Sequence, residues 1–132
     1  FFKVNAFLAK LMNEQTAYQA DLEEIHHTEK KDAPSGTAIT LAEGLINNNN
    51  RYSKWKLKEG EEKTEEGVLP ITSKRIDPAP GTHIVSYTSD IDDITINHTA
   101  HNRKGFALGA VLVAEWLPGK KGVLSMNDFL DF

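Results

Sequence analysis

The segment ADLEEIHHTEKKDAPSGTAITLAEGLI, residues 20–46, contains the change of pattern on which the fold and the function both depend. Its first part, ADLEEIHH, is short and mixed in polarity, which predicts a β-strand that runs into the two histidines. Ser35 is a favourable N-cap residue that follows a proline, so a helix is predicted to begin there. The apolar residues of this helix recur at helical spacing: Ala38, Leu41, Ala42 and Leu45. A charged loop therefore lies between a strand and a helix N-terminus.

Helical periodicity also occurs at both ends of the chain. Residues 1–12 carry an apolar stripe at helical spacing, and the same spacing returns at residues 104–117. Ser125, followed three residues later by an aspartate, predicts the start of a last short helix. The polar stretch 47–67 has too few apolar side chains to offset the entropy of ordering, so we expect a long exposed loop there, which Trp55 could anchor.

The second half of the chain carries three short β-branched runs that predict strands: residues 69–76, 83–90 and 93–100. The sequence SDIDD between the last two has the residues of a tight turn, which indicates a hairpin. This order of elements predicts an α+β fold with a mixed, largely antiparallel sheet covered on one face by helices. The apolar residues of these strands alternate incompletely, which favours a sheet that is also used in oligomerisation.

Composition excludes several classes of protein. The chain has 132 residues, a net charge of −4 and no cysteine. Its positive charges are spread along the sequence, so we expect no nucleic-acid partner. No apolar run approaches the roughly 20 residues that span a bilayer, and disulfides and thiolate metal sites are excluded. The sequence predicts one cytoplasmic globular domain without a membrane partner.

The first residues bear on whether the chain is complete. No Ser, Thr, Asp or Asn precedes the apolar stripe that begins near Phe1, so the first helix has no N-cap. We therefore expect the chain to be part of a longer protein. The alternative is a natural start with a frayed first turn.

The charged loop and the helix start together indicate an anion site. The amide groups of Ser35, Gly36 and Thr37 lie at a helix N-terminus, where unpaired N–H groups and a partial positive charge favour a carboxylate or phosphate. Lys30 lies a short loop upstream and could pair with the same anion. His26 and His27 can exchange protons near neutral pH. The segment thus combines an anion seat with a general acid.

Other interpretations of the same residues stay open. Adjacent side chains on a strand point to opposite faces, so His26 and His27 make a poor chelating pair and we expect no metal site. In the plainest interpretation, Ser35 caps a helix and the charges around Lys30 are solvated. A lyase that uses Lys30 as a Schiff-base amine would need an apolar pocket around that amine. Three further histidines are more typical of structural or surface positions: His83, His98 and His101.

The segment EIHHTEKKDAPSGTA resembles the signature of bacterial 4-hydroxy-tetrahydrodipicolinate reductases, also called dihydrodipicolinate reductases. RIDPAPGTH and HTAHNRKGFALGAVLVAEWLPGKKG are similar to two further segments of that family. The resemblance covers nearly the whole chain apart from the polar stretch 47–67. Asp77 stands where the family commonly has glycine, which lowers the weight given to Arg75 as a direct substrate contact.

The resemblance implies a two-domain, homotetrameric enzyme of which this chain is the C-terminal substrate-binding and oligomerisation domain, residues 1–132. An N-terminal Rossmann domain would bind NADPH or NADH, and this sequence contains no Gly-x-Gly-x-x-Gly turn that could replace it. The implied reaction reduces a small cyclic dicarboxylate, 4-hydroxy-tetrahydrodipicolinate, to tetrahydrodipicolinate in lysine and diaminopimelate biosynthesis. By itself the chain is expected to be inactive. The alternative is a stand-alone carboxylate-binding or oligomerisation module.

The resemblance also assigns roles by position. His26 and Lys30 correspond to the catalytic proton donors, and His27 corresponds to a substrate contact. The seat for a substrate carboxylate corresponds to Ser35, Gly36 and Thr37. Arg103 is a candidate contact to the cofactor.

Overall fold

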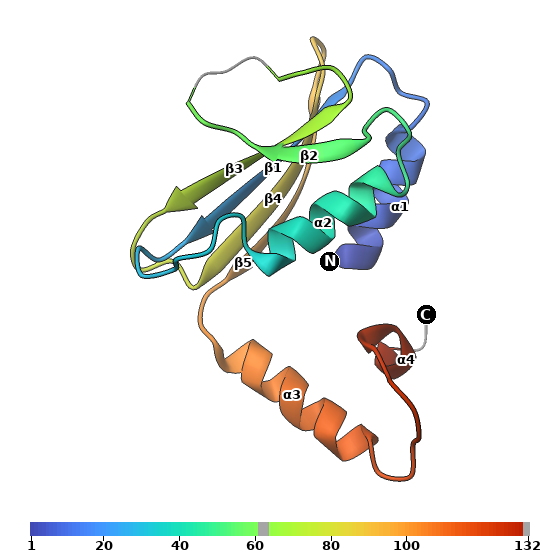
Figure 1. Ribbon diagram of the computed structural model, residues 1–132, viewed down its shortest axis with the longest axis vertical. Coiled ribbons are helices and arrows are strands. Elements are labelled where there is room, and N and C mark those ends of the chain that lie inside the picture. The colour runs from blue at the N-terminus through green and yellow to red at the C-terminus, as the bar shows by residue number, and fades with distance from the viewer. Residues whose placement is uncertain (61–63, 131–132) are drawn as a thin grey trace. The chain divides into compact units, whose positions relative to one another are not determined.

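A five-stranded mixed sheet forms the centre of the first of two units in this protein (Figure 1). The structure is a computed structural model, and it describes residues 1–60 and 64–130. The first unit comprises Phe1–His101, and the second unit begins at Asn102. Each unit is described by itself.

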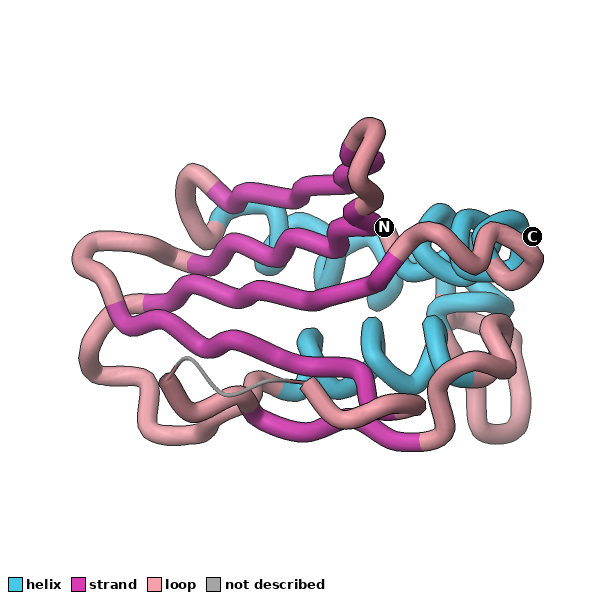
Figure 2. The backbone as a smooth tube through the Cα atoms, turned by 90° about the horizontal axis from the view of Figure 1, so that it is seen from above, coloured by secondary structure: helices cyan, strands magenta, loops and turns pink. Residues whose placement is uncertain are grey.

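The strand order in the sheet is β2-β3-β1-β4-β5, so β1 lies at the centre. The strands have these bounds: β1 Gln19–His26, β2 Lys54–Leu57, β3 Val68–Arg75, β4 Gly81–Thr88 and β5 Asp93–Ala100. Figure 2 shows them running side by side. The predicted α+β class and mixed sheet are confirmed, and the predicted hairpin joins β4 to β5.

The parallel part of the sheet is larger than the sequence suggested. β1 pairs with β3 and β2 with β3 in parallel, whereas only the β1–β4 and β4–β5 pairs are antiparallel. Parallel neighbours need a crossover connection, and the helix α2 (Gly36–Ile46) is the connection that follows β1. Because α2 returns the chain to the edge of the sheet where β1 starts, β2 runs in the direction of β1.

Part of the predicted long loop is a strand. β2 lies inside the stretch 47–67, and its residues alternate between exposed and half-buried. Trp55 and Leu57 are the half-buried ones and pack against the core, so the expectation of a loop was wrong here. The alternation K-W-K-L is a short strand signal that the surrounding Asn, Glu and Lys residues obscured. Residues 61–63 of the same stretch lie outside the described residues.

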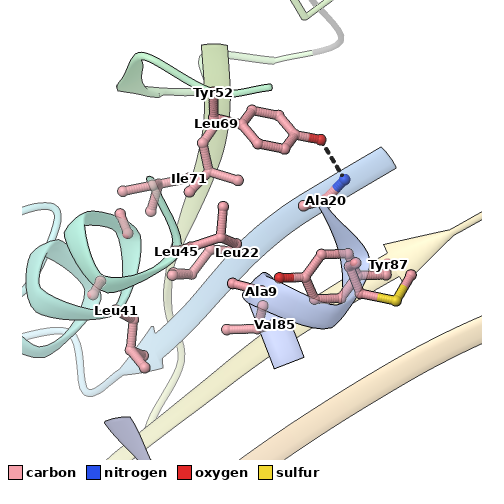
Figure 3. Close-up of a cluster of buried hydrophobic side chains, with 13 residues drawn as sticks. Ala9, Ala20, Leu22, Leu41, Leu45, Tyr52, Leu69, Ile71, Val85 and Tyr87 are labelled. Carbon is pink, nitrogen blue, oxygen red and sulfur yellow. Dashed lines mark hydrogen bonds between the residues drawn. The ribbon is translucent and has the colours of Figure 1, made fainter. Parts of the chain in front are cut away.

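The core lies between the sheet and the two helices α1 (Phe2–Met12) and α2, which cover one face (Figure 1). The four apolar residues predicted for α2 are all fully buried. Figure 3 shows Leu45 of α2 beside Leu22 of β1, Leu41 farther along the same helix, and Ala9 of α1 beside Val85 of β4. The hydroxyl of Tyr52 accepts a hydrogen bond from the Ala20 amide at 2.7 Å, also drawn in Figure 3. This packing fixes where β1 ends and α2 begins.

The second unit contains α3 (Lys104–Trp116) and α4 (Met126–Leu130). The capping interaction predicted at Ser125 is present, because its amide and hydroxyl both donate to Asp128 Oδ2, at 2.7 and 2.6 Å. Trp116 and Phe129 meet edge to face with their ring centres 5.5 Å apart. No helix in the described parts of the chain has the length and apolar character needed to cross a membrane.

Candidate functional site

The strand β1 carries buried polar residues at the end that leads into the charged loop. Its alternate residues Ala20 and Leu22 enter the core, and Glu24 and His26 continue on the same face. Glu24 is fully buried and His26 nearly so. A fully buried carboxylate is costly unless hydrogen bonds and charges compensate for the lost water, so its partners define the site.

Glu24 has a different set of partners on each of its two oxygens. Its Oε1 atom accepts hydrogen bonds from the amide of Ser35 at 3.1 Å and the hydroxyl of Ser73 at 2.8 Å. The guanidinium of Arg75 lies 3.4 Å from the same oxygen. Its Oε2 atom faces Nδ1 of His26 at 3.2 Å and Nε2 of His83 at 3.7 Å. One carboxylate thus joins the start of α2 to two imidazoles.

His83 belongs to this site, although the sequence suggested only a structural or surface role. It is buried on β4 directly opposite Glu24 in the antiparallel register. Its Nε2 atom lies 3.1 Å from Ser35 Oγ, and its ring meets the His26 ring edge to face at 5.1 Å. We call Glu24, His26, Ser35 and His83 the Glu24 cluster. The alternating pattern of β4 was the available signal, but only the strand register pairs His83 with Glu24.

The cluster sets the charge of each member. Burial alone would raise the pKa of Glu24, but hydrogen bonds from Ser35 and Ser73 and the nearby His26 lower it overall. Burial lowers the pKa of His26, against the attraction of Glu24. Burial, together with the neighbouring His26, lowers the pKa of His83 from 6.5 to about 4. At neutral pH the cluster therefore consists of a carboxylate between two uncharged imidazoles.

Arg75 holds the charged loop in place instead of facing outward. Its guanidinium donates to the carbonyl of Asp32 at 2.6 Å and to the carbonyl of Lys30 at 3.2 Å. Since its donors are directed at Glu24 and this loop, the structure agrees with the low weight given to Arg75 as a substrate contact.

Lys30 lies in the same loop and is mostly buried. Its Nζ atom is 2.8 Å from both carboxylate oxygens of Asp32, and this hydrogen bonding lowers the pKa of the Asp32 carboxyl. The ammonium is thus paired with a carboxylate, whereas a Schiff-base lysine stands in an apolar pocket. This geometry disfavours the lyase interpretation.

The start of α2 offers fewer amides to an anion than the sequence predicted. Ser35 is the N-cap of α2, and its hydroxyl accepts from the Ala38 amide at 3.2 Å while its own amide is bonded to Glu24. The amides left to an anion are those of Gly36 and Thr37, which belong to the first turn of the helix and have no acceptor within the part of the chain that the structure describes. Gly36 is exposed, and a Cβ atom built on it would meet open space. The seat is therefore accessible.

Two further predicted residues are not members of the Glu24 cluster, His27 and Arg103. His27 follows β1. The carboxylate of Asp77 accepts from the hydroxyl and the amide of Thr28 at 2.6 and 3.0 Å, and these hydrogen bonds lower its pKa. Asp77, the departure from the family pattern, thus fastens the start of the loop. Arg103 is the exposed N-cap residue of α3 in the second unit. All members of the cluster belong to the first unit.

Three members of the cluster have the residue types that bind metal ions. Among the described residues, Glu24, His26 and His83 each place a ligand atom within 4.8 Å of the other two. In the sequence only His26 and His27 are adjacent, so this trio was not predicted. Arg75 already brings a positive charge to the same carboxylate, which opposes a cation. We therefore interpret the trio as an electrostatic cluster in which one carboxylate faces two imidazoles.

Comparison with known proteins finds a family model and curated relatives that agree with one another. A family model described as the C-terminus of dihydrodipicolinate reductase matches residues 1–130. The 4-hydroxy-tetrahydrodipicolinate reductase of Christiangramia forsetii is 48% identical over 130 residues, which are 98% of this chain and 53% of that protein. The reductase of the same name from Sulfurimonas denitrificans is 36% identical over 137 residues, 96% of this chain and 53% of that protein. The chain thus spans about half the length of these curated relatives.

A solved structure shares the fold. It is a dipicolinate-bound dihydrodipicolinate reductase from Paenisporosarcina, with a TM-score of 0.60 and 24% sequence identity. The match covers 93% of this chain and 49% of that one.

Proposed function

Because this chain belongs to the family of dihydrodipicolinate reductase C-terminal domains, we propose that it is the substrate-binding and proton-donating domain of a 4-hydroxy-tetrahydrodipicolinate reductase. Its place in metabolism would be lysine and diaminopimelate biosynthesis in the cytoplasm. The ligand would be a small cyclic dicarboxylate, as the dipicolinate named with the related solved structure suggests.

One observation carries the proposal: the seat at the start of α2 and the general acid His26 are joined through a single buried carboxylate. The Ser35 amide and His26 Nδ1 approach the two oxygens of Glu24 at 3.1 and 3.2 Å. A carboxylate bound to the amides of Gly36 and Thr37 would therefore lie within a short distance of an imidazole that can give up or accept a proton.

Different residues of the chain would orient the ligand, supply positive charge and donate the proton. The seat would orient one carboxylate of the ligand, and Lys30 would add a positive charge to the same region. Reduction of a conjugated ring leaves electron density that must be protonated, and His26 is the proposed donor for that proton. His27, beyond the end of β1, is the proposed further contact to the ligand.

The nicotinamide cofactor, NADPH or NADH, would supply the hydride when bound. Its binding does not fit the described residues, because the strand-to-helix connection after β1 lacks the glycine-rich turn that holds a dinucleotide. We propose that a Rossmann domain outside this sequence binds it and that Arg103 assists. This chain alone should then show no NADPH oxidation above background. We propose further that the sheet face left uncovered by α1 and α2 forms the homotetramer.

Ligand titration tests the proposal directly. Calorimetry with pyridine-2,6-dicarboxylate should show one site per chain. Replacing Lys30 with methionine should weaken binding at least about tenfold, while the same replacement at exposed Lys31 should change it less than about twofold. Absence of binding, or equal losses in the two variants, would contradict the proposed function.

A proline substitution tests the seat itself. Gly36→Pro deletes one amide donor at the first helical position, where proline is well tolerated. Ser35 already has the extended backbone (φ −66°, ψ 157°) that a following proline requires. We expect the helix to persist and binding to fall. Unchanged binding would show that the ligand does not use this amide.

A further inference from the structure

We propose that Glu24 is a positioning residue that holds the proton of neutral His26 on Nδ1 and couples this imidazole to the start of α2, so that the domain takes up a proton when a dicarboxylate binds there. The inference rests on the proposed function for the nature of the ligand. It adds an assignment for Glu24 and a direction for proton movement, from solvent to His26 Nε2.

The contact between Glu24 and His26 indicates which ring nitrogen of His26 carries the hydrogen. Glu24 Oε2 and His26 Nδ1 are 3.2 Å apart, and neither atom has an aligned hydrogen-bond partner among the described residues. An ionised carboxylate can only accept, and its negative charge at this distance favours the tautomer that carries the hydrogen on Nδ1. The ring nitrogen left for a ligand is then Nε2, on the side of Gly81, where a built Cβ would come within 3.2 Å.

Glu24 also faces the helix start, which provides the coupling. Its Oε1 atom accepts from the Ser35 amide, so the carboxylate lies at the positive end of the α2 dipole. An anion on the neighbouring amides of Gly36 and Thr37 would add negative charge to the same region. Protonation of His26 would relieve that accumulation of negative charge.

The charges that act on His26 come from every neighbouring element. Glu24 on β1 and Asp32 in the loop favour its protonated form, whereas Lys30 in the loop and Arg75 on β3 oppose it. His83 on β4 is uncharged at neutral pH, because its pKa is lowered to about 4. With two positive and two negative neighbours, burial keeps His26 neutral in the free domain. A bound dianion changes this balance toward protonation.

The strand offers a matched control for Glu24. Glu23 is the preceding residue and points to the opposite face of the strand. Its carboxylate pairs with Lys74 Nζ at 2.6 Å. Glu24→Gln and Glu23→Gln therefore remove the same charge from adjacent positions, and only the first touches His26.

The first measurement needs no ligand. Nitrogen-15 NMR of histidine-labelled protein should show His26 as the Nδ1–H tautomer in the unmodified chain and in Glu23→Gln. Glu24→Gln should shift the population toward Nε2–H. An Nε2–H tautomer in the unmodified chain would overturn the assignment of Glu24 whatever the ligand does.

The second measurement counts the protons that the domain takes up when the ligand binds. Pyridine-2,6-dicarboxylate is titrated calorimetrically at pH 7.5 in two buffers of different ionisation enthalpy, and uptake of at least about 0.3 proton per bound ligand is expected. Glu24→Gln should reduce the uptake by more than about half, and Glu23→Gln should leave it unchanged. If Glu24→Gln does not fold, His26→Gln serves instead, and uptake should then disappear.

The outcomes separate the two proposals. Absence of binding would contradict the proposed function. Binding without proton uptake would leave the proposed function intact and overturn the coupling. Proton uptake that persists in the His26→Gln variant would also overturn the coupling, because the proton would then go to another group.

Discussion

Replacing His83 with glutamine should remove a large part of the acid sensitivity of this domain. In the folded state burial, with neighbouring His26, lowers the pKa of His83 from 6.5 to about 4. Between these two values the unfolded chain binds a proton at this residue and the folded chain does not, so stability falls as the pH is lowered from 7 toward 4. At pH 5 the two pKa values correspond to a loss of about 2 kcal/mol relative to pH 7.

Urea unfolding at half-unit steps from pH 4.5 to 7.5 measures this directly. The His83→Gln variant should lose about 2 kcal/mol less than the unmodified chain between pH 7 and pH 5, because glutamine can still bond to Ser35 Oγ and does not titrate. His26 and Glu24, whose pKa values are also lowered, leave some acid sensitivity in the variant. His101→Gln, at an exposed position, is the control. Parallel stability curves for the unmodified chain and His83→Gln would refute the reasoning.

Three further predictions concern single contacts. Ser35→Ala removes the cap of α2 and should cost about 1 kcal/mol of unfolding free energy, with no loss at all counting against the capping geometry. Gly81→Ala places a Cβ against the His26 ring, so the NMR signals of His26 should move, and unchanged signals would contradict the close approach. Leu45→Ala empties a fully buried position and should cost about 2–5 kcal/mol in urea unfolding, while Ile91→Ala, 90% exposed, should cost less than about 0.5 kcal/mol.

Much of the fold could be predicted because its signals are local. The stripe of α2 and its N-cap at Ser35 are both visible within 11 residues of sequence, and the structure confirms them. The strand β2 could not be separated from the loop around it, because four residues give too short a pattern. The parallel pairing of β3 with β1 and β2 was not specified by the sequence, since which strands become neighbours depends on how the chain crosses between them.

The candidate site also contains residues that the sequence could predict and residues that it could not. His26, Lys30 and the start of α2 lie within one segment, so their nearness was foreseeable from the chain itself. His83 was not, because it is 57 positions beyond His26 and meets it only through the register of β4 against β1. The use of the Ser35 amide by Glu24, which reduces the seat to Gly36 and Thr37, likewise needed the packed structure.

The sequence by itself determined which residues form α2 and that the N-terminus of this helix follows a strand ending in histidine. It also determined that imidazole, ammonium and free amide groups lie in the segment between them. These features depend on backbone hydrogen bonding and on side-chain periodicity over a few neighbouring residues. Only the tertiary structure decided that Glu24 would be buried between two imidazoles and a helix start. Burial removes water from that carboxylate, and three of its partners, Ser73, Arg75 and His83, come from strands that are distant in the sequence, so no local pattern can specify them.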